Sequence, residues 1–512
     1  MKEFIEKYRD CIEGVLEGFD RVIFRGTLRS VSHKDGFGKY MNSQGILLKN
    51  FDTWAERCTK RLIQHIEGLA EAAGRPCQYL TSSAVSKEEL ARTIAVRDGV
   101  TEGLVCVLSC VEPCYSAEIR SDRATKKLQL IFTQRKCKFM YLIDPTFGWM
   151  HIRIQTWIPF DVQVYINGRS YLQRQMDTAG IRYVQEGNCF TGINDLSKAQ
   201  RLMDRLVTMN WPSTLRRLLE PWWPASEAGL LPEGPERFYW TIRQSEVATD
   251  VMFKNAADLA SIYPRLCRYA IVGLSCEDIL KFMGKSPSRL SGEVTSSCQK
   301  LVQGVRIKHQ VATNTIKMYD KAGSVLRIET TINNPGTFRV FRGRLDQPDK
   351  NPQWRAMAKG VADIRRRMQV CLQANARYWA ALACVGNDAS TAAVLDPVSR
   401  PVVQADKRER GLRPIGPDDA ALFAAVMDGK NLLDGFTNGN LQTAMLPAPP
   451  KDETERRRRS NWTGRKLRLL RRHGLIGKIG ARRLYRVTPK GHRVMGLALA
   501  IRQSFTGLSA VA

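Results

Sequence analysis

The sequence has no long uninterrupted apolar run. No stretch approaches the roughly 20 residues that a helix needs to cross a bilayer, and the N-terminus MKEFIEKYRD is charged, unlike a signal peptide. These absences predict a soluble cytoplasmic protein, associated with the bacterial nucleoid if it binds DNA, and argue against a membrane partner.

Paired cysteines are also missing. The 13 cysteines include no Cys-x-x-Cys pair and are odd in number, which argues against a disulfide framework and a zinc ribbon. The closest group is Cys106, Cys110 and Cys114, whose spacing puts them on one face of a predicted strand. Buried thiols are the simpler interpretation; a metal site with Cys137 as fourth ligand is the alternative.

The sequence contains no Gly-rich phosphate loop of the Walker type, so ATP-driven action is not indicated. No internal repeat or low-complexity tract is visible. Acidic residues are scarce: 50 Asp and Glu stand against 79 Lys and Arg, a formal net charge of +29. Such a surface attracts polyanions, and nucleic acid is the expected partner.

Length and periodicity predict a multidomain α+β protein. We expect an α/β body over 1–213, a linker rich in Pro and Trp over 214–237, a central α+β domain over 238–396, a linker over 397–417 and a winged-helix domain over 418–505.

Within the first two domains, the periodicity separates helices from strands. Helices are expected near 3–16, 52–73, 86–97, 168–178, 197–209, 256–269, 276–283 and 354–383. Strands are expected near 20–28, 104–111, 128–132, 149–157, 162–166, 304–309, 315–320 and 324–331.

The C-terminal segment has helical patterns at 418–427, 438–445 and 454–473, the last ended by Gly474 as a C-cap. A basic hairpin-like stretch and a final helix follow. The run TGRKLRLLRRHGLIGKIGARRLYRVTPKGHR resembles winged-helix domains of bacterial regulators and mobile-element proteins. The resemblance implies that 462–472 is a recognition helix in the major groove of duplex DNA.

Between Arg456 and Arg493 there are 15 Lys or Arg and no Asp or Glu. Cationic side chains neutralise phosphates and release counterions. A basic helical tail that binds RNA or is merely solvated is the alternative. The candidate nucleic-acid contacts are Arg465, Lys466, Arg468, Arg471, Arg472, Lys478, Arg482 and Arg483.

The stretch GVRIKHQVATNTIKMYDKAGSVLRIETT predicts neighbouring strands joined by a tight turn at 321–324, which would bring Tyr319 near Arg327 or Glu329. It resembles the Tyr-Asp-Lys and Arg-Ile-Glu pattern of replication initiators from rolling-circle plasmids and filamentous phages.

That resemblance implies DNA nicking. Asp320 and Glu329 would hold a divalent ion, Mg²⁺ or Mn²⁺, and Lys321 would offset developing charge. Tyr319 would be an adjunct or the nucleophile. The alternative is a sheet edge with a salt-bridged Arg–Glu pair.

His151 is a further catalytic candidate, because it shares a strand face with Arg153 and Gln155, where nickases hold metal ligands. An ordinary histidine is the alternative. Other acidic candidates are Asp20, Glu118, and Glu246 with Asp250, the last two meeting on one face if helical. A transposase of the ribonuclease-H type would combine Asp20 and Asp144 with Glu246 or Glu329.

Aromatic residues lie among basic ones at 135–141, 237–243 and 377–380, a mixture that suits single-stranded nucleic acid. The runs FDRVIFRGTL, HIRIQTW and KMYDKAGSVLRIETT are similar to a group of bacterial proteins, a likeness that implies no activity. The sequence therefore predicts a mobile-element or plasmid protein that cleaves DNA with metal assistance. A structured-RNA-binding protein, with or without a guide RNA, and a non-catalytic DNA-binding regulator are the alternatives.

Overall fold

The computed structural model describes residues 1–82, 85–120, 127–224, 231–285, 294–301, 304–343, 352–385, 391–404, 407–428, 435–479 and 483–506. The chain forms two compact units, Met1–Cys267 with Glu293–Trp379, and Arg268–Gly292 with Ala380–Ala512. Among the described helices, none combines the length and apolarity that a membrane span requires.

The first unit is built on one mixed sheet of 11 strands, in the order β10-β11-β12-β13-β9-β1-β6-β5-β4-β3-β2. All neighbouring pairs are antiparallel except β2 with β3. The strands are β1 (Ile12–Leu28), β2 (Cys77–Tyr79), β3 (Gly103–Arg120), β4 (Lys127–Asp144), β5 (Gly148–Gln155), β6 (Val162–Asn167), β9 (Phe238–Phe253), β10 (Val294–Leu301), β11 (Gly304–Val311), β12 (Asn314–Lys321) and β13 (Val325–Ile332).

The sheet consists of two halves with the same path. Each half begins with one long strand, passes through helices, and returns as a four-stranded antiparallel meander whose last strand pairs with the first. In one half β6 pairs with β1, and in the other β13 pairs with β9. Because β1 and β9 pair with each other antiparallel, the halves are related by an approximate twofold axis. The repeat that the sequence does not show is present in the topology.

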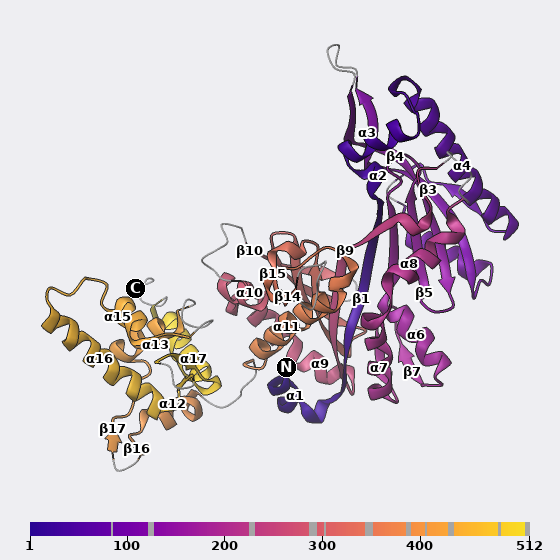
Figure 1. Cartoon of the computed structure of the whole chain (residues 1–512). Coiled ribbons are helices and arrows are strands. Elements are labelled where there is room, and N and C mark those ends of the chain that lie inside the picture. Colours follow the sequence, from indigo (N-terminus) through magenta and orange to yellow (C-terminus); the bar gives the residue numbers. More distant parts are fainter. Residues whose placement is uncertain are drawn as a thin grey trace. The chain divides into compact units, whose positions relative to one another are not determined.

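The long pairing of β1 with β9 joins the halves (Figure 1). The predicted boundary at 214–237 therefore does not divide two sheets. Small hairpins are added by β7 (Tyr183–Gln185) with β8 (Phe190–Ile193) and by β14 (Arg339–Arg342) with β15 (Gln353–Ala356).

At the central strands the sheet has one apolar face and one more polar face, because side chains alternate along each strand. Val22, Phe24 and Val164 are buried on the apolar face, whereas their neighbours Arg21 and Arg25 are partly exposed. The helices beginning in this unit are α1 (Lys2–Lys7), α2 (Arg29–Ser32), α3 (Lys34–Ser43), α4 (Phe51–Ala72), α5 (Lys87–Arg97), α6 (Gly168–Thr178), α7 (Leu196–Thr208), α8 (Trp211–Leu219), α9 (Ala256–Arg268) and α11 (Ile364–Leu382).

The second unit has a small apolar core that includes Phe423, Leu470 and Val494. Its elements are α10 (Cys276–Phe282), α12 (Thr391–Ser399), β16 (Val402–Gln404), β17 (Lys407–Glu409), α13 (Pro417–Met427), α15 (Asn438–Met445), α16 (Glu453–Arg472), β18 (Ile476–Lys478), β19 (Tyr485–Val487) and α17 (Pro489–Thr506). Gly474 ends α16 with a φ of +72°, the left-handed conformation expected of a C-cap.

Most predicted elements are present, with three corrections. The helix predicted over 3–16 ends at Lys7, and β1 begins at Ile12. The helix predicted over 354–383 begins only at Ile364, and part of the preceding segment is β15. Residues 238–253 form β9, a central strand, so Glu246 and Asp250 lie on a strand and not on a helix.

Candidate functional site

Three carboxylates from three different strands meet on the polar face of the sheet. Asp20 lies on β1, Glu246 on β9 and Glu329 on β13. All three are buried, and one ligand atom from each lies within 4.8 Å of the others. Among the described residues, these three form the group of His, Cys, Asp or Glu side chains that is close enough to hold one metal ion.

A β-bulge directs Asp20 into this group. The register of β1 against β9 shifts between Phe19 and Arg21, so an extra residue is inserted at Asp20. The backbone of β1 next to the bulge is in close contact with helix α6, because Gly168 at the start of α6 lies against Phe19. A Cβ atom at Gly168 would stand 1.8 Å from the Phe19 carbonyl oxygen.

Each carboxylate of the group has a cationic partner. Arg21 Nη2 is 2.6 Å from Glu246 Oε1, and Arg327 Nη1 is 2.7 Å from Asp20 Oδ1. Lys317 Nζ lies between two acids, 2.7 Å from Glu329 Oε1 and 3.4 Å from Glu246 Oε1.

A second set of ion pairs extends the network. Asp250 is fully buried and accepts from Arg169 at 2.9 Å and from Arg327 at 2.6 Å. Four acids therefore face four cations, namely Asp20, Glu246, Asp250 and Glu329 against Arg21, Arg169, Lys317 and Arg327.

The ion pairs set the ionisation of the site. Burial alone would raise the pKa of Glu329, but Lys317 and Arg327 outweigh burial and lower this pKa to about 2. Burial likewise opposes the charged form of Asp250, yet Arg169 and Arg327 hold its pKa below the ordinary value. Both acids are ionised at neutral pH.

Tyr319 adds a hydroxyl group to the carboxylates. Its Oη donates to Glu329 Oε2 at 2.6 Å, and its side chain is partly exposed. Burial, and next the charge of Glu329, raise the pKa of Tyr319 well above its usual value. A hollow of about 160 Å³ opens beside it, lined by Lys317, Asp320 and Lys321 among others. As the tight turn predicted, Tyr319 lies opposite Arg327 and reaches Glu329.

Asp320 does not join Glu329. Asp320 is paired in register with Leu326, and Glu329 with Lys317, so the two acids lie on opposite faces of the sheet. Asp320 is therefore not placed to share one ion with Glu329, and the acids that lie close to Glu329 are Asp20 and Glu246. Lys321 lies over the ring of Tyr319, 5.7 Å from its centroid.

His151 is also separate from the acidic group. Its ring stacks on Tyr165, with centroids 4.7 Å apart and an interplanar angle of 8°. Burial lowers the pKa of His151 to about 4, so the ring is neutral at physiological pH. The remaining acids have structural partners: Asp144 Oδ1 accepts two backbone N–H groups of its own turn, and Glu118 pairs with Arg135 at 2.6 Å.

Glu246 and Asp250 lie on one face of strand β9, and not on one face of a helix as their spacing had suggested. An even spacing places two residues on the same side of a strand, just as a spacing of four does on a helix. On β9 they face different partners: Glu246 belongs to the acidic group, whereas Asp250 is closed off by Arg169 and Arg327.

The donor set of the acidic group suits a hard divalent ion, since Mg²⁺ and Mn²⁺ prefer carboxylate oxygen. The thiols form no comparable group in the described residues. Cys114 and Cys137 are buried with their sulfurs 3.7 Å apart, and Arg153 donates to both at 3.0 Å.

In the second unit, the predicted cationic residues of α16 divide into two sets. Arg465 and Arg471 are exposed, and among the described residues no carboxylate pairs with either. Arg468 and Arg472 lie 3.5 and 3.7 Å from Glu409, and Lys466 lies 4.0 Å from Asp419. Lys478 and Arg483 are exposed; Arg482 lies outside the described residues.

Sequence reasoning did not find Arg21, Arg169 or Lys317 as parts of the site. An arginine directly after Asp20 and a lysine two residues before Tyr319 were the available signals. The basic aromatic segment 377–380 proves to be core, since Tyr378 and Trp379 are fully buried.

Comparison with models of known families gives no match, and comparison with curated proteins gives none either.

Proposed function

We propose that this protein binds DNA and cleaves one strand of it with the help of a divalent ion. The observation that carries the proposal is the hydrogen bond from Tyr319 to Glu329, at the edge of a buried group of three carboxylates. A hydroxyl nucleophile beside a hard-ion donor set is what phosphodiester cleavage through a tyrosine needs.

In the proposed reaction, Tyr319 Oη attacks the phosphorus atom of the scissile phosphate. The bond from phosphorus to the 3′ oxygen breaks and the tyrosine becomes joined to the 5′ phosphate. The proton of Tyr319 passes by way of Glu329 to the 3′ oxygen, which leaves as a hydroxyl. Asp20, Glu246 and Glu329 would hold the ion, whose charge would polarise the phosphate. Lys317, which lies between Glu246 and Glu329, would be released toward the substrate.

For duplex recognition we propose the second unit. The order α13, α15, α16, hairpin β18–β19 and α17 fits a winged helix, with α16 as the recognition helix. Arg465 and Arg471 would contact phosphates or base edges. By the resemblance to replication initiators and mobile-element proteins, the proposed DNA is an origin or element end near the protein's own gene.

The test is cleavage of a supercoiled plasmid that carries the DNA bordering the gene, with Mg²⁺ or Mn²⁺. We expect open circles and a covalent protein–DNA adduct that resists denaturation, and we expect Tyr319→Phe to abolish both. Tyr165→Phe is the matched control, because Tyr165 is a partly exposed tyrosine on the same sheet face. Cleavage that survives Tyr319→Phe would overturn the assignment of the nucleophile.

One observation favours a second function. Every carboxylate of the site already has a cationic partner, which is also what a purely structural network requires. A non-catalytic DNA-binding regulator would use the second unit alone. It would bind the bordering DNA with unchanged affinity after Tyr319→Phe and would cut none of it under any metal.

A further inference from the structure

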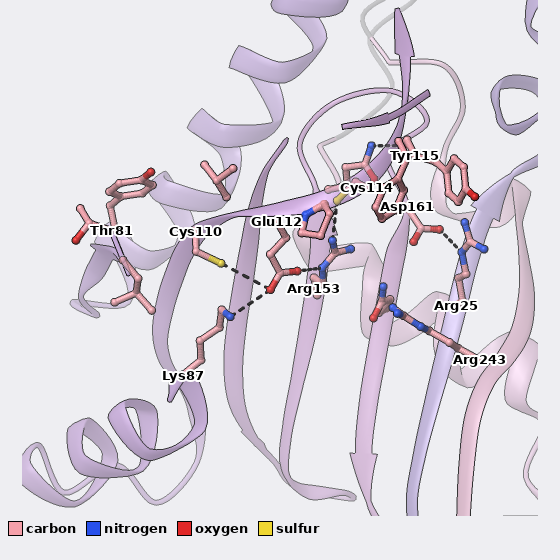
Figure 2. Close-up of a pocket in the computed structure, with 17 residues that line it drawn as sticks. Arg25, Thr81, Lys87, Cys110, Glu112, Cys114, Tyr115, Arg153, Asp161 and Arg243 are labelled. Atoms are coloured by element: carbon pink, nitrogen blue, oxygen red, sulfur yellow. Dashed lines mark hydrogen bonds and ion pairs between the residues drawn. The ribbon is translucent and has the colours of Figure 1, made fainter. Parts of the chain in front are cut away.

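A groove on the first unit lies over strands of the first half of the sheet, apart from the acidic group. Its volume is about 550 Å³, within the range of ligand sites. It runs from the β2 edge, at Thr81, across to Arg25 on β1 and Arg243 on β9 (Figure 2).

The groove is cationic. Its lining includes four cations, Arg25, Lys87, Arg153 and Arg243, and two acids, Glu112 and Asp161, a net charge of +2. Arg25 is 2.6 Å from Asp161, while Arg153 and Lys87 share Glu112 at 2.9 and 3.2 Å. Arg243 is exposed and has no ion pair among the described residues. The groove thus fits an anionic ligand.

Two large rings stand exposed beside these cations. Tyr115 is 60% and Phe132 62% exposed, and the rings pack edge to face with centroids 5.2 Å apart. Aromatic side chains of this size are normally buried. Exposed rings next to cations suit unpaired bases, which stack on rings while arginines follow the phosphates.

The twofold relation of the halves gives this groove a counterpart. In the second half, one row across β12, β13 and β9 is Tyr319, Arg327 and Asp250. The corresponding row across β5, β6 and β1 is Arg153, Gln163 and Arg25. The groove therefore occupies, in the first half, the place that the candidate site occupies in the second, with cations in place of the carboxylate and the tyrosine.

The two places lie on one face of β1. Arg21 pairs with Glu246 of the acidic group, and Arg25, four residues along the strand, lines the groove. At a rise of about 3.3 Å per residue, they are about 13 Å apart. A single strand leaving the candidate site along β1 would reach the groove within a few nucleotides.

We propose that this groove binds unpaired nucleotides of a DNA strand, with bases on Tyr115 and Phe132 and phosphates on Arg25 and Arg243. In naming the ligand as the strand that is cut, the inference rests on the proposed function. It assigns the first half of the sheet to holding the strand and the second half to the chemistry.

The experiment uses the full chain and a fluorescent oligothymidylate, with EDTA to prevent cleavage and excess unlabelled duplex to occupy the second unit. We expect Tyr115→Ala with Phe132→Ala to weaken single-strand binding by about tenfold or more. The control is Phe341→Ala with Trp354→Ala, a second exposed edge-to-face pair with centroids 5.8 Å apart on β14–β15, away from the groove. Unchanged affinity of the first variant, or equal losses in both, would overturn the proposal.

A second measurement does not depend on variants. An oligonucleotide with 5-iodouracil, cross-linked to the wild-type protein by light, should attach to Tyr115 or Phe132. Cross-links that map only elsewhere would refute the groove as the site. Cleavage assays separate the two proposals. If Tyr319→Phe loses cleavage but keeps its affinity for the single strand, both proposals are supported. If the wild-type protein does not cleave but still binds the single strand through the groove, only the proposed function is removed.

Discussion

The hydroxyl of Tyr319 donates a hydrogen bond of 2.6 Å to Oε2 of Glu329, while Lys317 binds the other oxygen of the same carboxylate at 2.7 Å. Both oxygens of Glu329 are therefore used, and the buried acid is held on a strand that is buried along its whole length. The stability of the sheet therefore depends on the negative charge of Glu329.

Glu329→Gln should lower the free energy of unfolding by about 3–5 kcal/mol, because removing one partner leaves the cation of Lys317 without its main counter-charge. Urea unfolding would measure the change. Glu118→Gln, which breaks the more exposed pair with Arg135, should cost no more than about 1 kcal/mol. Equal losses would show that burial of the pair does not matter.

The same carboxylate predicts a loss of stability in acid. The pKa of Glu329 is about 2 when folded, below the value of about 4.3 in an unfolded chain. A carboxyl group whose pKa is lower in the folded than in the unfolded protein stabilises the fold at pH values above its unfolded pKa. This stabilisation is lost as the pH falls through the folded pKa. We expect the unfolding free energy to fall between about pH 5 and pH 2, and to fall less steeply in Glu329→Gln.

Gly168→Ala should strongly destabilise the first unit, because the new methyl group would meet the Phe19 carbonyl oxygen at 1.8 Å and push α6 away from the bulge at Asp20. Thermal unfolding would report it. Gly68→Ala is the control: Gly68 lies in α4 with open space around it, and alanine there should stabilise the helix by about 0.5–1 kcal/mol. An unchanged melting temperature for Gly168→Ala would contradict the close approach.

Cys114 should react with iodoacetamide with a midpoint near pH 7. The hydrogen bond from Cys137, and then the charge of Arg153, lower the pKa of Cys114 to about 7 despite burial, and the thiol lines the groove. Arg153→Met should move the midpoint upward. Mass spectrometry would follow each cysteine separately, and Cys58, whose pKa burial raises to about 12, serves as the unreactive reference. A Cys114 that stays inert up to pH 9 would count against this ionisation.

Arg465→Ala and Arg471→Ala should each weaken binding to duplex DNA and reduce the slope of log affinity against log salt by about one. Both side chains are exposed on α16. Titrations at several salt concentrations would measure the slopes, with Arg97→Ala, an exposed arginine of α5 in the other unit, as control. Slopes that match the control's would exclude α16 as the duplex contact.

The sequence by itself determined what depends on neighbours along the chain. The hairpin of β12 and β13 follows from two strands and a tight turn, and with it the approach of Tyr319 to Glu329. The element order of the C-terminal segment follows from helical periodicity and from Gly474, where only a residue without Cβ takes φ = +72° at low cost.

Only the tertiary structure decided which acids meet. Asp20 and Glu246 are far apart in sequence, and they lie together because β1 pairs with β9 and a bulge turns Asp20 inward. A spacing of four is shared by one face of a helix and one face of a strand, so Glu246 and Asp250 alone did not reveal β9. Pairing between distant strands has no local signature, and this is why the shared sheet, its repeated halves and the groove emerged only from the fold.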